Sequence, residues 1–153
     1  MNKGYGLRAL NIMHKALLMG QIIFAAVCVY LVYSGMVKPF SIDFDKPLQV
    51  IALLLAAAGV FAGNAFFKKK LLQIRDLEAN AKQRFEAYRA ACLLHWAFLE
   101  APAIFSIICF FLTGNYAFIA LALLLIMIFA LQAPSKNKVA QQLQVDEADL
   151  EEL

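Results

Sequence analysis

The chain has 153 residues and a formal net charge of +3, with 63% hydrophobic and 16% charged residues. Soluble domains have roughly 45–50% apolar and about 25% charged residues. Four separate apolar runs in the sequence approach or exceed the roughly 20 residues with which a helix crosses a bilayer. The composition therefore excludes a soluble globular domain and predicts an all-α membrane protein.

The four apolar runs predict a four-helix transmembrane bundle. In chain order the helices cover about 16–37, 48–67, 90–112 and 116–133. The first run follows a basic start, but it is longer than the apolar region of a signal peptide, which has about 7–15 residues, so we expect it to remain as a helix. The fourth run is short, and we expect it to borrow Gln132 and Ala133 or to thin the bilayer locally. Residues 1–134 are thus predicted to form one transmembrane domain.

Basic residues set the predicted orientation of this bundle. They gather in the N-terminal segment, in the connection 68–89 and just after residue 134, whereas the opposite side holds only Lys38 and Lys46. Loops rich in Lys and Arg stay on the cytoplasmic side. Both termini and the 68–89 connection are therefore predicted to be cytoplasmic.

The tail at 135–153 is acidic and is expected to be a solvated cytoplasmic segment. Its Asp and Glu residues have no basic residue close by in the sequence after Lys138. Val139, Leu143, Val145 and Leu150 are spaced for a short amphipathic helix. Contact of the tail with the basic stalk is the alternative.

Three consecutive lysines, Lys68, Lys69 and Lys70, lie where the second helix leaves the membrane. Each gains roughly 1 kcal/mol near an anionic membrane surface. We interpret them as contacts to lipid headgroups, and no nucleic-acid partner is needed to explain them.

The 68–89 connection contains neither Gly nor Pro and is rich in helix formers. Its apolar residues recur at spacings of three and four: Leu71, Ile74, Leu77, Ala81, Phe85, Tyr88 and Cys92. This period predicts that the second and third helices extend as a cytoplasmic hairpin stalk that turns near Asp76 to Lys82. The stripe either packs the two extensions against each other or forms a docking surface for a protein partner.

The second helix carries a pattern that is typical of close helix packing. Gly59 and Gly63 lie four residues apart, with Ala58 and Ala62 beside them. Small residues at this spacing allow two helix backbones to approach closely in lipid. The contact is either within the chain or between copies, and we expect a homo-oligomer.

Glu100 is the strongest functional candidate, because it interrupts the third apolar run. It lies about 15 Å into that run at 1.5 Å per residue, close to half of the roughly 30 Å hydrocarbon thickness. A charge there costs at least a few kcal/mol, so the carboxyl group needs a partner, a proton or a function. Pro102 has no N–H group, which leaves the Phe98 carbonyl without its helical donor. A carboxylate beside a free carbonyl can bind H⁺ or Na⁺; a protonated Glu100 that bonds a neighbouring helix is the alternative.

Three other polar residues lie within the apolar runs and are weaker candidates. His95 and Asn64 are predicted to contribute to the ion site, although His95 lies about 140° around the helix from Glu100 at 3.6 residues per turn. Gln21 is a further candidate in the first helix. Buried Gln and Asn side chains also commonly tie membrane helices together.

No enzyme motif is present in the sequence. There are two histidines, and no nucleophile elbow, phosphate-binding glycine loop or zinc-protease motif occurs. The three cysteines, Cys28, Cys92 and Cys109, have no metal-site spacing. We therefore predict no catalytic residue, no metal and no cofactor.

Two resemblances bear on function. The second and third helices resemble the hairpin of the ATP synthase proteolipid, the rotor-ring subunit, and the stretch from Phe98 to Phe105 is similar in character to that around its ion-carrying carboxylate. This resemblance implies an ion-carrying role for Glu100. The whole chain resembles a group of uncharacterised four-helix membrane proteins of Bacteroidota in the segments 98–102, 111–115 and 133–138. That resemblance implies a bacterial inner-membrane location.

The expected function is that of a small, non-enzymatic, oligomeric membrane protein in which Glu100 binds H⁺ or Na⁺, as an ion-translocating or ion-sensing subunit. The alternative is a structural or partner-binding membrane subunit that uses the cytoplasmic stalk.

Overall fold

The computed structural model describes residues 5–39 and 45–145, and all regular structure in these ranges is helical. The helices are α1 (Tyr5–Tyr33), α2 (Asp45–Arg75), α3 (Ala81–Thr113), α4 (Tyr116–Ala130) and α5 (Lys136–Leu143). Three of them, α1, α2 and α3, are long and apolar enough to cross a membrane, and α4 is apolar but shorter. The predicted all-α class and the membrane character are thus confirmed.

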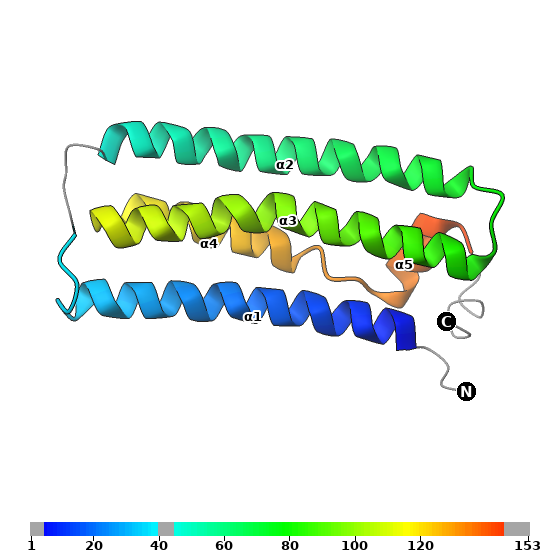
Figure 1. Ribbon diagram of the computed structural model, residues 1–153, viewed down its shortest axis with the longest axis horizontal. Coiled ribbons are helices and arrows are strands. Elements are labelled where there is room, and N and C mark those ends of the chain that lie inside the picture. Colours follow the sequence, from blue (N-terminus) through cyan, green and yellow to red (C-terminus); the bar gives the residue numbers. More distant parts are fainter. Residues whose placement is uncertain (1–4, 40–44, 146–153) are drawn as a thin grey trace.

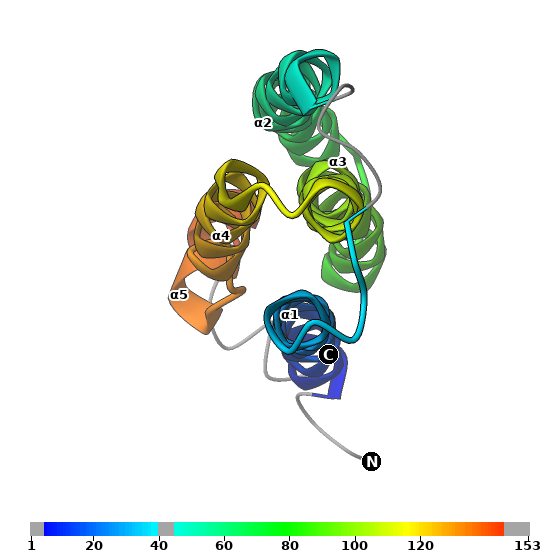
Figure 2. The same ribbon diagram turned by 90° about the vertical axis from the view of Figure 1, so that its left-hand side faces the viewer.

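Helices α1 to α4 run side by side, with α3 at the centre (Figure 1). The end view shows α2 on one side of α3, and α1 and α4 on its other sides (Figure 2). Helices α1 and α3 run in one direction and α2 and α4 in the other. The start of α1, the α2–α3 turn and α5 lie at one end, which we call the α5 end, and the opposite end is called the far end.

Capping residues define the two tight turns between helices. Residues 76–80 separate α2 from α3, as predicted, and the Asn80 side chain accepts a hydrogen bond from the Gln83 N–H group at 2.9 Å. At the far end, Gly114 has φ +70° and ends α3, because this left-handed conformation favours glycine. Asn115 then caps α4 by accepting from the Ala117 N–H group, and its amide donates to the Asp45 carboxylate.

The first helix differs from the predicted range of 16–37. It begins at Tyr5 and ends at Tyr33. The early start follows from packing, since Leu10 and His14 lie four residues apart on one helix face and are 0% and 1% exposed. The early end coincides with Gly35, whose φ of +71° is incompatible with a continuing helix.

The first part of the tail is not solvated, contrary to the main expectation. Residues 136–143 form α5, which Ser135 caps through its side chain. Three apolar residues of α5 are buried: Val139, Ala140 and Leu143. Tyr88 of α3 donates to Gln142 Oε1 at 2.7 Å, and Arg75 of α2 donates to the Gln142 carbonyl at 2.8 Å. The acidic residues that follow position 145 lie outside the described residues.

The apolar stripe of the predicted stalk packs within the chain. Its members Leu71, Ile74, Phe85, Tyr88 and Cys92 are buried, and they share a core cluster with residues of α1 and α5. Leu77, at the turn, remains 45% exposed. Intramolecular packing therefore accounts for most of the stripe.

Candidate functional site

Helix α2 meets α3 through its two glycines. A Cβ atom added at Gly63 would lie 2.9 Å from Phe98 Cβ and 3.2 Å from His95 Cδ2. A Cβ atom added at Gly59 would collide with the Phe98 carbonyl oxygen and lie 3.0 Å from Pro102 Cγ. Both glycines therefore face α3 of the same chain.

The Phe98 carbonyl, which Pro102 deprives of its helical donor, is directed at α2. Its oxygen faces Gly59 so closely that no side chain fits between them. A glycine Cα–H group in this position can donate a weak hydrogen bond. The carbonyl that the sequence suggested as an ion ligand thus lies in the α2–α3 contact.

His95 and Asn64 are joined to each other. His95 Nε2 lies 3.1 Å from Asn64 Oδ1, and the ring of Phe67 stacks on the imidazole with centroids 4.7 Å apart. His95 is 6% exposed. The pair connects α2 to α3 on the side where the glycines lie, whereas Glu100 projects from another side of α3.

Glu100 lies on the side of α3 that approaches α1. Trp96, one turn earlier, contacts the His14 ring of α1 with centroids 4.9 Å apart, and residues four apart share a helix face. The Glu100 side chain is half-buried. Within the described part of the chain it has no hydrogen-bond or ion-pair partner.

Gln21 of α1 lies at a level of the bundle close to that of Glu100. It is 2% exposed, and neither its amide nitrogen nor its amide oxygen has a hydrogen-bond partner among the described residues. His14 and Gln21 share the face of α1 that packs on α3 and α4, because they are seven residues apart. The contact between His14 and Trp96 sets the register of these two parallel helices. At 1.5 Å per residue Gln21 then lies about 10 Å beyond His14, and Glu100 about 6 Å beyond Trp96.

A carboxyl group and an unpartnered amide are thus found at nearly the same depth of the α1–α3 contact. The sequence identified Glu100 and Gln21 as candidates. It did not predict that they lie at similar depth, because the two residues are far apart along the chain. The structure also does not gather Phe98, His95 and Asn64 around Glu100.

A polar cavity of about 200 Å³ lies at the α5 end. It exists because α4 ends at Ala130, close to the level where Phe129 stacks on His14, so that a loop and α5 cover the rest of α3. The cavity is lined by Asn64, Phe67, Tyr88, Cys92, His95, Trp96, Gln132, Lys138 and Gln142. The sequence pattern does not predict this site, since its residues come from four separate segments.

No metal site accompanies these polar groups. Among the residues that the structure describes, no three His, Cys, Asp or Glu side chains are close enough to hold a metal ion. Cys28, Cys92 and Cys109 are free and buried.

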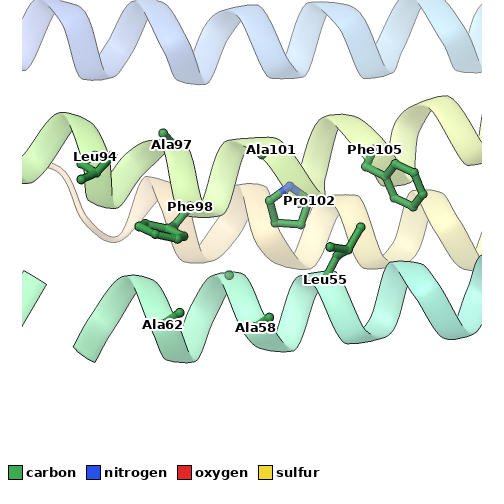
Figure 3. A pocket seen from close by; sticks show the side chains of 10 residues that line it. Leu55, Ala58, Ala62, Leu94, Ala97, Phe98, Ala101, Pro102 and Phe105 are labelled. Carbon is green, nitrogen blue, oxygen red and sulfur yellow. The ribbon is translucent and has the colours of Figure 1, made fainter. Parts of the chain in front are cut away.

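An apolar groove of about 600 Å³ runs between α2 and α3 on their outward side. Figure 3 shows that Ala58 and Ala62 of α2 and Ala97 and Ala101 of α3 line it with small side chains. Nearer the α5 end of α2, Lys68, Lys69 and Lys70 are exposed. The Lys70 ammonium group lies 5.8 Å from the centroid of the Phe66 ring.

No protein-family model, no curated protein and no solved structure matches this chain.

Proposed function

We propose that this protein is a small, non-enzymatic, multipass membrane protein of the bacterial inner membrane in which Glu100 reversibly takes up a proton. Helices α1 to α4 each cross the bilayer in this proposal. Helix α4 has 15 residues and is about 22 Å long, so the loop that follows it completes the crossing.

The α5 end is proposed to face the cytoplasm. It carries nearly all of the described basic residues: Arg8, Lys15, Lys68, Lys69, Lys70, Arg75, Lys82, Arg84, Arg89, Lys136 and Lys138. The far end has Lys38 and Lys46, and Asp45 directly precedes Lys46 in the chain. This distribution follows the positive-inside rule.

The observation that carries the proposal is a half-buried Glu100 without a hydrogen-bond or ion-pair partner among the described residues, at a helix level close to that of the buried, unpartnered amide of Gln21. Glu100 lies about 20 Å along the helix axis from Thr113, which is deep within the hydrocarbon layer. An ionised carboxylate is costly at this depth, and a bound proton removes the charge. An amide can accept a hydrogen bond from the protonated carboxyl and donate one to the ionised form. Gln21 can therefore serve both states of the site.

A proton fits these groups better than Na⁺ does. Hard cations such as Ca²⁺ and Mg²⁺ require several oxygen ligands, and a sodium site in protein is likewise built from several oxygens. The Phe98 carbonyl faces Gly59 instead. One carboxyl group and one amide oxygen would leave most of the coordination shell of a sodium ion unfilled.

In this proposal the protein forms an oligomer through a surface that does not include Gly59 and Gly63. Gly59 and Gly63 already pack on α3. A second copy would have to use an outward face, such as that of the apolar groove. The rival function is a structural or partner-binding subunit in which Glu100 stays protonated permanently.

The test uses a hydrophobic carbodiimide, which reacts with protonated carboxyl groups inside membranes. We expect Glu100 to be modified in the full-length protein in lipid, and modification to decline reversibly as the pH rises. Glu100→Gln should fold normally and lose the reaction. The matched control is Glu86→Gln, the same change at an exposed carboxyl near the start of α3. Replacement of Gln21 by Leu should shift the pH at which modification declines.

Two results would overturn the proposal. One is the absence of modification at every pH, and the other is a pH profile that Gln21→Leu leaves unchanged. Sodium at high concentration should not protect Glu100; protection by sodium would indicate that the ion is Na⁺.

A further inference from the structure

We propose that the cavity at the α5 end is a binding site for a small oxyanion of phosphate size. The proposal is independent of the role of Glu100, because the cavity lining does not include that residue. The ligand is a tetrahedral oxyanion with a hydroxyl group. Either a free phosphate ion or the headgroup of phosphatidic acid has this chemistry.

The cavity is a built site and not a gap between helices. Its walls come from α2, α3, the 131–135 loop and α5. The Tyr88 hydroxyl donates to Gln142, and the Arg75 side chain donates to the backbone of the same residue, so α5 is tied over the cavity at two points. Val139 and Leu143 anchor α5 in the core below it. Hydrogen bonds and apolar packing therefore hold the lining side chains in place.

The cavity lining carries one positive charge, that of Lys138, and no carboxylate. Lys138 is half-buried, and no carboxylate within the described residues forms an ion pair with it. The other lining side chains are neutral aromatic, amide and thiol groups together with His95. A partly desolvated ammonium group without a partner is unfavourable, and a bound anion would offset this cost.

The hydrogen-bonding groups further restrict the anion. Gln132 Oε1 is buried and accepts no hydrogen bond from any described residue. An amide oxygen is an acceptor only, so it requires a donor on the ligand. Lys138 requires an acceptor. A protonated phosphate supplies both, since it has negative oxygens and a hydroxyl group, whereas sulfate lacks the hydroxyl at neutral pH.

The volume agrees with a ligand of this size. A cavity of about 200 Å³ corresponds to about six or seven water molecules at roughly 30 Å³ each. A phosphate group fits in this volume together with a few waters.

The experiment measures binding of inorganic phosphate to the full chain in detergent, by calorimetry and by the shift in unfolding temperature. We expect saturable binding and weaker binding of sulfate. Lys138→Gln should weaken phosphate binding about tenfold or more, because it removes a charge-assisted hydrogen bond. The matched control, Lys82→Gln, removes the same charge at an exposed position of α3 and should leave binding unchanged.

A second variant tests the hydroxyl of the ligand. Gln132→Met keeps the size of the side chain and removes its amide, so the preference for phosphate over sulfate should disappear. Each variant must first show the helix content and the unfolding temperature of the parent protein without anions. A variant that fails this control is replaced by Lys138→Met or Gln132→Leu.

An experiment in lipid distinguishes the two sources of the phosphate group, the free ion and the headgroup of phosphatidic acid. The protein is placed in nanodiscs of phosphatidylcholine, with or without phosphatidic acid, and free phosphate is titrated. Competition between phosphatidic acid and free phosphate that depends on Lys138 would identify the lipid headgroup, and its absence would identify the free ion.

Two outcomes overturn the proposal. One is the absence of phosphate binding by the full chain, and the other is equal binding by the parent and Lys138→Gln.

Discussion

Pro102 and Gly59 act together at the contact between α2 and α3. The proline leaves the Phe98 carbonyl without a helical donor, and the glycine of α2 lies directly against that oxygen. A larger residue than glycine would separate the helices, and the carbonyl would then be buried without any partner. The close packing of α2 against α3 at this point thus depends on both Pro102 and Gly59.

Alanine substitutions test this contact. We expect Gly63→Ala to destabilise the protein by about 1–3 kcal/mol, the usual cost of overpacking, because the new Cβ would lie 2.9 Å from Phe98 Cβ. Gly59→Ala should cost more, since its Cβ would meet backbone that cannot move aside. The measurement is reversible unfolding in mixed micelles.

Gly20→Ala is the control for these variants. A Cβ added at Gly20 would meet no atom within 4 Å apart from the adjoining residues and the backbone of its own helix. Alanine is favoured over glycine in a helix interior by about 1 kcal/mol. This variant should be neutral or slightly more stable than the parent. Equal stability of the Gly20 and Gly63 variants would contradict the packing explanation.

At the scale of elements, α5 is held by few interactions and depends on each of them. It has 8 residues, which is too short for a stable isolated helix. Its stability must come from its buried apolar residues, Val139, Ala140 and Leu143, and from the two hydrogen bonds at Gln142.

Tyr88→Phe removes one of these bonds without changing the packing of the ring. We expect a loss of about 1 kcal/mol, seen as faster hydrogen exchange of the amides of α5 and little change in α3. Tyr116→Phe is the matched control, because its ring contacts Phe110 and its side chain is 56% exposed. If α5 exchanges equally fast in the parent and in Tyr88→Phe, the hydrogen bond does not hold α5.

At the scale of the whole molecule, the two ends of the helices differ in charge. The turn between α2 and α3 lies at the basic α5 end, and Ser34 lies at the far end. The proposed orientation therefore places these two positions on opposite sides of the membrane.

Cysteine labelling in intact cells tests the orientation. A membrane-impermeant maleimide should label Ser34→Cys from outside, and it should label Asn80→Cys only after the cells are opened. Both positions are exposed, while the native cysteines are buried and should remain unlabelled. Labelling of Asn80→Cys in intact cells would show that the orientation is reversed.

The sequence by itself determined the helical class, the long helices and the position of the α2–α3 turn. These features depend on local information: apolar runs of sufficient length, residues that favour helix, and apolar residues that recur at spacings of three and four. The same information also identified Glu100 as a carboxyl group within an apolar helix.

The tertiary structure alone decided which residues meet. His14, which precedes the range predicted for the first helix, bonds the carbonyl of Phe129, 115 residues away. His95 bonds Asn64, and a polar cavity forms under α5 from residues of four separate segments. Such pairings depend on helix register and on the faces that pack together. Both are properties of the assembled helices, since a rotation or shift of one helix changes every partner without changing any local preference.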